Sequence, residues 1–176
     1  MAASPPRFRL RRFVVMGVAG CGKTSVGQAV AARLGATFLD GDDLHPASNI
    51  AKMSAGAPLT DADRAPWLAQ VGAILRDVPH VTLIGCSALK RSYRDIIRQA
   101  AAAPVGFLHL AAARAVIAAR MADRQGHFMP LSLLDSQYAA LEHLQPDEIG
   151  LTVHVGQSLD ALADEILTGL DHLTRP

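Results

Sequence analysis

Cysteine, net charge and long apolar runs are all scarce in this sequence. The two cysteines, Cys21 and Cys86, form neither a C-x-x-C pair nor the framework of a disulfide-rich secreted protein, so a reducing cytoplasm is the expected location. The longest apolar runs are too short to cross a membrane, and no apolar segment of the signal-peptide type precedes residue 17. A net charge of +1 gives no general electrostatic basis for binding nucleic acid or a membrane surface. What remains is a soluble globular protein.

Acidic residues are missing from the first part of the chain. No Asp or Glu precedes Asp40, whereas arginines recur within residues 1–12. An Arg-rich, acid-free start is typical of organellar transit peptides and also of a short disordered tail. A first strand that begins by Phe13 leaves too little length for a transit peptide, so residues 1–12 are predicted to be a disordered basic tail. Residues 13–176 then form one domain, as suits a chain of 176 residues without repeats or linkers.

One short motif points to nucleotide chemistry. The pattern G-x-x-x-x-G-K-[ST] is matched by Gly17, Val18, Ala19, Gly20, Cys21, Gly22, Lys23 and Thr24. Its glycines let the backbone turn tightly and aim N–H groups at a polyphosphate, and the helix that follows adds its positive end. Lys23 can then bridge the β- and γ-phosphates of ATP, and the Thr24 hydroxyl can ligate Mg²⁺. A Gly-rich turn without a ligand is the alternative, but the strand–loop–helix context favours this phosphate-binding P-loop.

Short apolar runs alternate with longer helical patterns along the chain. The runs predict strands at Phe13–Met16, Thr37–Leu39, Val81–Cys86, Val105–Leu110 and Leu151–Val155. The periodic stretches predict helices at Lys23–Leu34, Asp61–Asp77, Lys90–Ala102, Ala112–Asp123, Leu131–His143 and Leu159–Leu173. This α/β order indicates a three-layer fold in which helices cover both faces of a five-stranded parallel sheet. Ligands of such sheets bind at the carboxyl ends of the strands, so the residues just after each strand are the candidates for function.

Local signals support three of the helix ends. Thr60 with Asp63, and Ser132 with Asp135, have the spacing of a capping box at a helix start. Gly35 follows the first helix at the position of a C-cap glycine.

An acidic turn follows the second predicted strand. Asp40 and Asp42 alternate in what is expected to be an extended segment, so their carboxylates should face the same way. Beside a P-loop they can support Mg²⁺ through water, which we assign to Asp40, and accept a hydroxyl proton, which we assign to Asp42. A polar turn that caps the next helix is the alternative, and Asp43 is expected to do only that.

Cations follow the third and fourth strands. Lys90, Arg94 and Arg98 recur at i, i+4 spacing, and the first two are candidates for binding an anionic substrate, whereas Arg98 is expected to be structural. A solvated helix face is the alternative.

After the fourth strand, Arg114, Arg120, Arg124, Gly126 and His127 suggest an Arg-bearing lid around residues 120–135 that closes over transferring phosphates. A helix C-terminus rich in cations explains the same residues equally well. Within the P-loop, Cys21 is interpreted as a tolerated small residue, with oxidation as a secondary hypothesis because a helix N-terminus favours thiolate.

Several longer segments carry a family resemblance. They include Phe38–Pro46 (Phe-Leu-Asp-Gly-Asp-Asp-Leu-His-Pro), Asn49–Met53, Gly56–Asp61, Asp63–Leu68, Cys86–Asp95 and Gly126–Phe128. Together with the P-loop, these segments resemble the small P-loop gluconokinases, relatives of shikimate kinase, over roughly residues 13 to 170. Cys21 departs from the serine that is usual in the family.

The resemblance implies a strand order of 2-3-1-4-5 and transfer of the ATP γ-phosphoryl group to the 6-hydroxyl of D-gluconate with Mg²⁺ as cofactor. It also implies a homodimer. It points to Asp42 beside the acceptor hydroxyl, with His45, Arg64, Lys90 and His127 around the substrate. It assigns Arg120 to the nucleotide and Arg124 to catalysis beside Lys23.

Other activities fit the sequence less well. A GTPase switch needs an Asn-Lys-x-Asp guanine reader, which is absent, and a remodelling ATPase needs an apolar run that ends in Asp-Glu. Within kinases, shikimate or a nucleoside monophosphate is the alternative acceptor.

Overall fold

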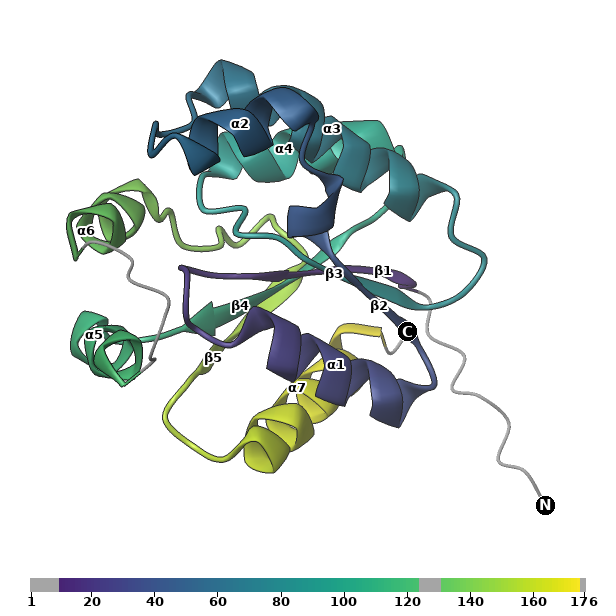
Figure 1. Ribbon diagram of the computed structural model, residues 1–176. Coiled ribbons are helices and arrows are strands. Elements are labelled where there is room, and N and C mark those ends of the chain that lie inside the picture. The colour runs from purple at the N-terminus through teal and green to yellow at the C-terminus, as the bar shows by residue number, and fades with distance from the viewer. Residues whose placement is uncertain (1–9, 124–130, 175–176) are drawn as a thin grey trace.

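A five-stranded parallel sheet forms the centre of the molecule (Figure 1). The computed structural model describes residues 10–123 and 131–174. The strands are β1 (Arg12–Met16), β2 (Thr37–Asp40), β3 (Thr82–Gly85), β4 (Gly106–Ala111) and β5 (Gly150–His154). Their order in the sheet is β2-β3-β1-β4-β5, and every neighbouring pair is parallel. The predicted fold class and strand order are therefore confirmed, with strand ends shifted by one residue or so.

Helices cover both faces of this sheet. They are α1 (Lys23–Leu34), α2 (Ala47–Ser54), α3 (Asp61–Arg76), α4 (Arg91–Ala101), α5 (Arg114–Ala122), α6 (Leu131–Ala140) and α7 (Leu159–Thr174), with a short 3₁₀ helix, η1 (Gly41–Leu44). α1 and α7 lie on one face, α3 and α4 on the other, and α5 and α6 lie together at one end (Figure 1). Across the described ranges, none of these helices has the length and apolar character needed to cross a membrane.

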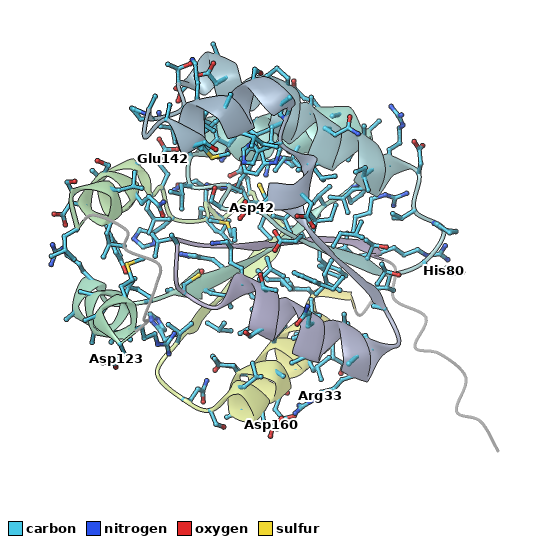
Figure 2. All side chains as sticks on the ribbon, viewed as in Figure 1. Arg33, Asp42, His80, Asp123, Glu142 and Asp160 are labelled. Atoms are coloured by element: carbon cyan, nitrogen blue, oxygen red, sulfur yellow. The ribbon has the colours of Figure 1, made fainter. Side chains whose placement is uncertain are left out.

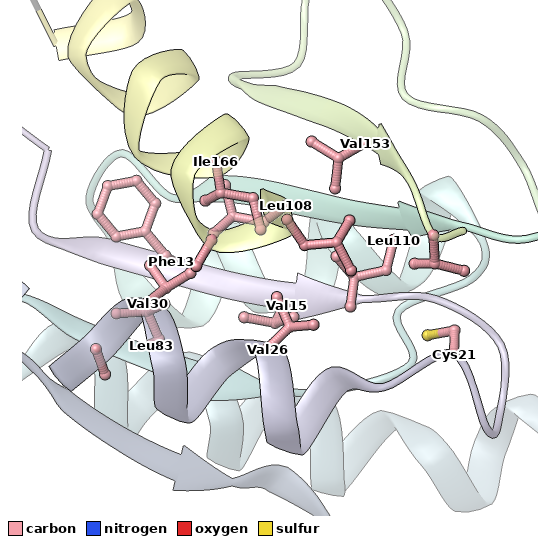
Figure 3. Packing of buried hydrophobic residues seen from close by; sticks show 14 of the residues in the cluster. Phe13, Val15, Cys21, Val26, Val30, Leu83, Leu108, Leu110, Val153 and Ile166 are labelled. Atoms are coloured by element: carbon pink, nitrogen blue, oxygen red, sulfur yellow. The ribbon is translucent and has the colours of Figure 1, made fainter. Parts of the chain in front are cut away.

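The core has two layers because successive residues of each strand point to opposite faces. On β1, Phe13 and Val15 pack against α1 and α7, as Figure 3 shows, whereas Val14 and Met16 pack against α3 and α4. Burial on both faces explains why the three central strands, β1, β3 and β4, are largely apolar in sequence. The two helices of the first face are also joined by an ion pair, 2.7 Å long, between Arg33 of α1 and Asp160 of α7 (Figure 2).

α3 and α4 approach each other unusually closely at Gly72. A Cβ atom built on Gly72 would lie 2.4 Å from the carbonyl oxygen of Ile97 and 2.7 Å from the Cβ of Ala100. Glycine is therefore required at this crossing point by space. The contact ties together the two helices that carry the polar residues described below.

Helix ends test the local signals. Thr60 and Asp63 form the predicted capping box at the start of α3, and Gly35 ends α1 with a left-handed φ of 61°. The prediction at Ser132 was wrong: α6 begins at Leu131, so Ser132 lies inside the helix, and Asp135 pairs with Arg114 of α5 instead.

Two further features differ from prediction. α2 was not expected, because only Asn49 of its eight residues is buried and its larger apolar side chains, Ile50 and Met53, are exposed. The last residues of the predicted tail also belong to the folded domain: Leu10 is buried, and Arg12, the first residue of β1, donates from Nε to the carbonyl of Leu75 over 2.8 Å. The rest of the predicted tail, residues 1–9, lies outside the described residues.

Candidate active site

The P-loop connects the end of β1 to the start of α1. Gly17, Gly20 and Gly22 have φ values of 147°, 78° and 101°, a region that disfavours any residue with a side chain. At Gly17 a Cβ would also lie 2.9 Å from the carbonyl oxygen of Leu110 on β4. Backbone conformation therefore requires glycine at all three positions, as the motif predicts, and at Gly17 space requires it as well.

The side chain of Lys23 folds back over this loop. Its Nζ donates to the carbonyl oxygens of Gly17, over 3.1 Å, and Val18, over 3.2 Å. Both partners are neutral, and no carboxylate in the described part of the chain pairs with this ammonium. It is held at the mouth of the loop, beside the N-terminus of α1, where two positive potentials add.

The P-loop is also contacted from the α5–α6 end of the molecule. The backbone N–H of Ala19 donates to Oε1 of Gln137 on α6, over 2.7 Å. A Cβ on Gly20 would lie 3.3 Å from Met121 and 3.4 Å from Ile117, so α5 packs directly on the loop. The pKa of Cys21 is raised by burial, and the charge of Arg120 on α5 opposes that rise only weakly. The assignment of Arg120 to the nucleotide stays a prediction, whereas Gln137 was missed because nothing in the sequence marks it.

The thiol of Cys21 lies inside the P-loop, away from solvent. It is only 1% exposed, and burial raises its pKa above the ordinary value even though the charge of Lys23 opposes this. The raised pKa argues against the thiolate on which the hypothesis of oxidation sensitivity rests, and that hypothesis stays a prediction. The sulfur of Cys21 lies 2.7 Å from the position that a Cβ on Gly17 would take, so the Cys21 side chain fills space inside the loop.

Asp40 links the P-loop helix to the acidic turn. Its Oδ2 accepts a hydrogen bond of 3.3 Å from the hydroxyl of Thr24, and its Oδ1 accepts one of 3.0 Å from the backbone N–H of Asp42. Asp40 therefore caps η1, and the segment is a 3₁₀ turn where we predicted extended chain. A hydroxyl and a carboxylate at this spacing are hard oxygen donors of the kind that Mg²⁺ prefers.

Asp42 stands on that turn, between the sheet and the α2–α4 side (Figure 2). The turn passes very close to β3: a Cβ on Gly41 would lie 2.2 Å from the carbonyl oxygen of Gly85. Partial removal from water raises the pKa of Asp42, and the Asp40 carboxylate raises it further, while Lys23 and His45 act in the opposite direction. A raised pKa makes Asp42 a better proton acceptor than an ordinary aspartate.

Asp43 has a different place from the one predicted. α2 begins after Pro46 and has no side-chain cap, so Asp43 does not cap it. Asp43 is exposed on η1.

His45 follows the turn and stacks on the only tryptophan. The ring centroids of His45 and Trp67 are 4.0 Å apart with an interplanar angle of 17°, and the indole N–H of Trp67 donates to the carbonyl of Gly41 over 2.7 Å. Burial lowers the pKa of His45, and the charge of Arg64 lowers it further against the opposing effect of Asp42. The ring is therefore a neutral hydrogen-bonding group at neutral pH.

The predicted substrate cations Arg64 and Lys90 meet at one aromatic ring. Nζ of Lys90 lies 5.4 Å from the ring centroid of Tyr93, and the guanidinium carbon of Arg64 lies 5.8 Å from it. Lys90 also pairs with both carboxylate oxygens of Asp61, each at 3.1 Å, and the Tyr93 hydroxyl donates to the same carboxylate. These hydrogen bonds, that of Tyr93 first, lower the pKa of Asp61. The structure thus brings together two cations and one exposed carboxylate.

Arg94, the other predicted substrate residue of this run, is structural. Its side chain has no exposed surface, and Nε and Nη2 donate to Glu148 over 2.7 and 2.9 Å. Nη1 donates to the carbonyls of Ala88, Leu89 and Glu142. The prediction for Arg94 was wrong because i, i+4 spacing gives a shared face but not its depth. Arg98, expected to be structural, also pairs with Glu148, at 2.8 Å.

A cavity of about 310 Å³ adjoins the P-loop at Val18. The carboxyl end of β4 and the helix α6 form its walls, which include His109, Tyr138 and His143. The lid was predicted around residues 120–135. Of its named residues, Arg124, Gly126 and His127 fall outside the described residues, which leave out the stretch between α5, ending at Ala122, and α6, beginning at Leu131.

Known proteins resemble this chain over most of its length. A family model described as an AAA domain matches residues 13–144. A gluconokinase of Gluconobacter oxydans is 47% identical over 165 residues, which cover 92% of this chain and 90% of that relative. The thermosensitive gluconokinase of Escherichia coli is 52% identical over 139 residues, 77% of this chain and 74% of that relative. This chain belongs to the gluconokinase family.

Solved structures agree with membership of the gluconokinase family. A gluconokinase from Sinorhizobium meliloti has a TM-score of 0.87 at 47% identity, over 96% of this chain and 95% of that one. A shikimate kinase from Aquifex aeolicus, at 15% identity and a TM-score of 0.61 over 92% of this chain and 96% of its own, shares the fold alone. As a member of the gluconokinase family, the protein is a small-molecule kinase of the P-loop type.

Proposed function

We propose that this protein transfers the γ-phosphoryl group of ATP to the 6-hydroxyl of D-gluconate, which yields 6-phospho-D-gluconate and ADP. One observation carries the proposal: gluconokinases match nearly the whole chain at 47% identity. The P-loop, the acidic turn and the pair of cations support it, since they supply a phosphate-binding loop, a proton acceptor and partners for a carboxylate. The switch GTPase considered at the outset has no support from these comparisons.

The P-loop side holds the nucleotide. Backbone N–H groups at the start of α1 surround the phosphates, and the Lys23 ammonium exchanges its two carbonyl partners for β- and γ-phosphate oxygens. Thr24 and Asp40 are the residues that would hold Mg²⁺, directly or through water. When bound, the ion neutralises phosphate charge.

The opposite side holds the acceptor. Asp42 orients the 6-hydroxyl and takes its proton as the oxygen–phosphorus bond forms and the bond to the ADP oxygen breaks. Its raised pKa suits that task. Arg64 and Lys90 bind the carboxylate of the sugar acid, and His45 binds an oxygen of its chain.

We also propose a cytoplasmic homodimer. Its basis is the resemblance to small gluconokinases, and analytical ultracentrifugation of the purified chain measures the assembly state.

A panel of acceptors tests the activity. ATP-dependent phosphorylation should favour gluconate over glucose, shikimate and nucleoside monophosphates, because glucose has no carboxylate to compensate the two cations. Two charge-assisted hydrogen bonds to the carboxylate are together worth several kcal/mol, so we expect kcat/KM to differ by about a thousandfold. Comparable kcat/KM for glucose and gluconate would refute the assignment, and a preference for shikimate would establish the alternative kinase.

A further inference from the structure

Asn49 is a buried polar residue that the mechanism so far does not use. It lies in the first turn of α2 and is only 2% exposed. Its Nδ2 is 2.9 Å from the carbonyl oxygen of Asp63 on α3 and 3.3 Å from Nδ1 of His45. A single amide group therefore contacts both the helix that carries Arg64 and the imidazole beside the acidic turn.

The first contact decides the orientation of the amide. A backbone carbonyl oxygen only accepts hydrogen bonds, so the Asn49 atom that faces Asp63 must be the nitrogen. The second hydrogen of the same nitrogen is then available to His45. Since the amide nitrogen only donates, Nδ1 of His45 must accept, and it carries no proton.

A neutral imidazole with an unprotonated Nδ1 carries its proton on Nε2. The plane of the ring is set by its stacking on Trp67, whose indole is in turn anchored to the carbonyl of Gly41. Tautomer and plane are thus both set by neighbours on other elements. The charged groups that face the ring are Asp42 from η1 and Arg64 from α3.

We propose that Asn49 is a positioning residue that holds His45 as the Nε2–H tautomer, so that the ring donates a hydrogen bond to an oxygen of the acceptor. The part that concerns the acceptor rests on the proposed function. A donor at this point selects a hydroxyl or carboxylate oxygen and leaves proton acceptance to Asp42 alone.

Nitrogen-15 NMR of the full chain labelled at histidine reads the tautomer directly, with His45→Gln to assign the signals. We expect a protonated Nε2, an unprotonated Nδ1 and a shift of the Nε2 signal when gluconate is added. A proton on Nδ1, or an Nε2 signal that saturating gluconate does not move, overturns the proposal. This arm needs no turnover, so its failure is distinguishable from failure of the proposed function, which the acceptor panel detects.

Asn49→Asp and Asn49→Ala form the matched pair of variants. Both lose the hydrogen bond to Asp63, but only the new carboxylate accepts from Nδ1–H and reverses the tautomer. We expect Asn49→Asp to raise the KM for gluconate about tenfold more than Asn49→Ala, the scale of one hydrogen bond, with equal KM values for ATP. Equal KM values for gluconate in the two variants would show that Asn49 only joins α2 to α3, and would overturn the proposal.

Discussion

Lys90 and Arg94 stand four residues apart at the start of α4, yet their surroundings differ completely. Lys90 pairs with Asp61, whose side chain is 64% exposed, and the lysine itself remains within reach of solvent. Arg94 is fully buried, and its guanidinium meets two carboxylate oxygens and three or more backbone carbonyls. Lys90 can therefore exchange its partner for a ligand, whereas Arg94 cannot.

The physical reason is the cost of an unpaired charge. An exposed pair is worth little, because water replaces either partner at small cost. A buried pair contributes little net stability when intact, but removal of one partner leaves an uncompensated charge that is expensive. Substitutions in the exposed site should therefore change activity, and those in the Arg94 cluster should change stability.

Lys23→Ala is expected to have the largest effect on activity. The ammonium acts where charge develops between the β- and γ-phosphates, so kcat should fall about 10³-fold, the upper range for one preorganised donor. The melting temperature should hardly change, because Lys23 contacts only two backbone carbonyls. Steady-state kinetics together with thermal unfolding test this, and near-normal turnover in the folded variant would refute the role of the P-loop.

Glu148→Gln tests the buried side of the comparison. It leaves the Arg94 guanidinium buried without its carboxylate, so the free energy of unfolding should fall by about 3 kcal/mol or more. The kcat of the folded fraction should match that of the unsubstituted protein. Denaturant unfolding measures the first quantity, and an unchanged midpoint would contradict the comparison.

Acid should have a similar effect on the same cluster. Burial by itself would raise the pKa of Glu148, but hydrogen bonds from Arg94, Gln145 and Arg98 outweigh it and hold the pKa at about 2, against an ordinary 4.5. The stability from this depressed pKa is complete above pH 4.5 and is lost as the pH falls towards 2. Unfolding midpoints across that range should fall for the unsubstituted protein more steeply than for Glu148→Gln.

Asp42→Asn, with Asp43→Asn as its control, sharpens the comparison within the acidic turn. The amide keeps the shape of Asp42 and removes its proton affinity, so kcat should fall about 10²-fold with the KM for ATP nearly unchanged. Asp43→Asn should cost little activity. Kinetics at saturating gluconate decide between them: equal losses would mean that the catalytic carboxylate has been assigned to the wrong position.

Lys90→Met should have the smallest of these effects. It removes one cation from the pair that we assign to the acceptor carboxylate, so the KM for gluconate should rise about tenfold, as for one charge-assisted hydrogen bond. Stability should change little because the lost ion pair is exposed. A loss of stability without a change in KM would place Lys90 with Arg94 as a structural cation.

Much of this could be predicted from sequence because it depends on local patterns. The P-loop needs glycine at positive φ, and buried parallel strands need continuous apolar runs, so both are visible in the chain. How deeply a side chain is buried is not visible in the sequence in the same way. Arg94 and Lys90 have the same spacing signal, and only the packing of Glu148 against α4 separates them.

Contacts between distant segments were also beyond sequence reasoning. The bond from Ala19 to Gln137 spans 118 positions, and its partners carry no motif. The bond from Asn49 to Asp63 depends on α2, a short helix whose larger apolar side chains are exposed. Cys21 shows the reverse error: a rule for helix N-termini predicted thiolate, but burial of the side chain outweighed it.

The close crossing of α3 and α4 at Gly72 couples that point to the distant N-terminal end of α3. From Gly72 the helix α3 runs 11 residues back to Asp61, about 16 Å at 1.5 Å per residue. A side chain at the crossing would force the two helices apart and tilt the far end, where Asp61 and Arg64 face Lys90 and Tyr93 across the gap. A methyl group placed well away from the acceptor would thus be magnified into a misalignment at its binding groups. A substitution at Gly72, far from the acceptor, would thus still reach its binding groups through α3.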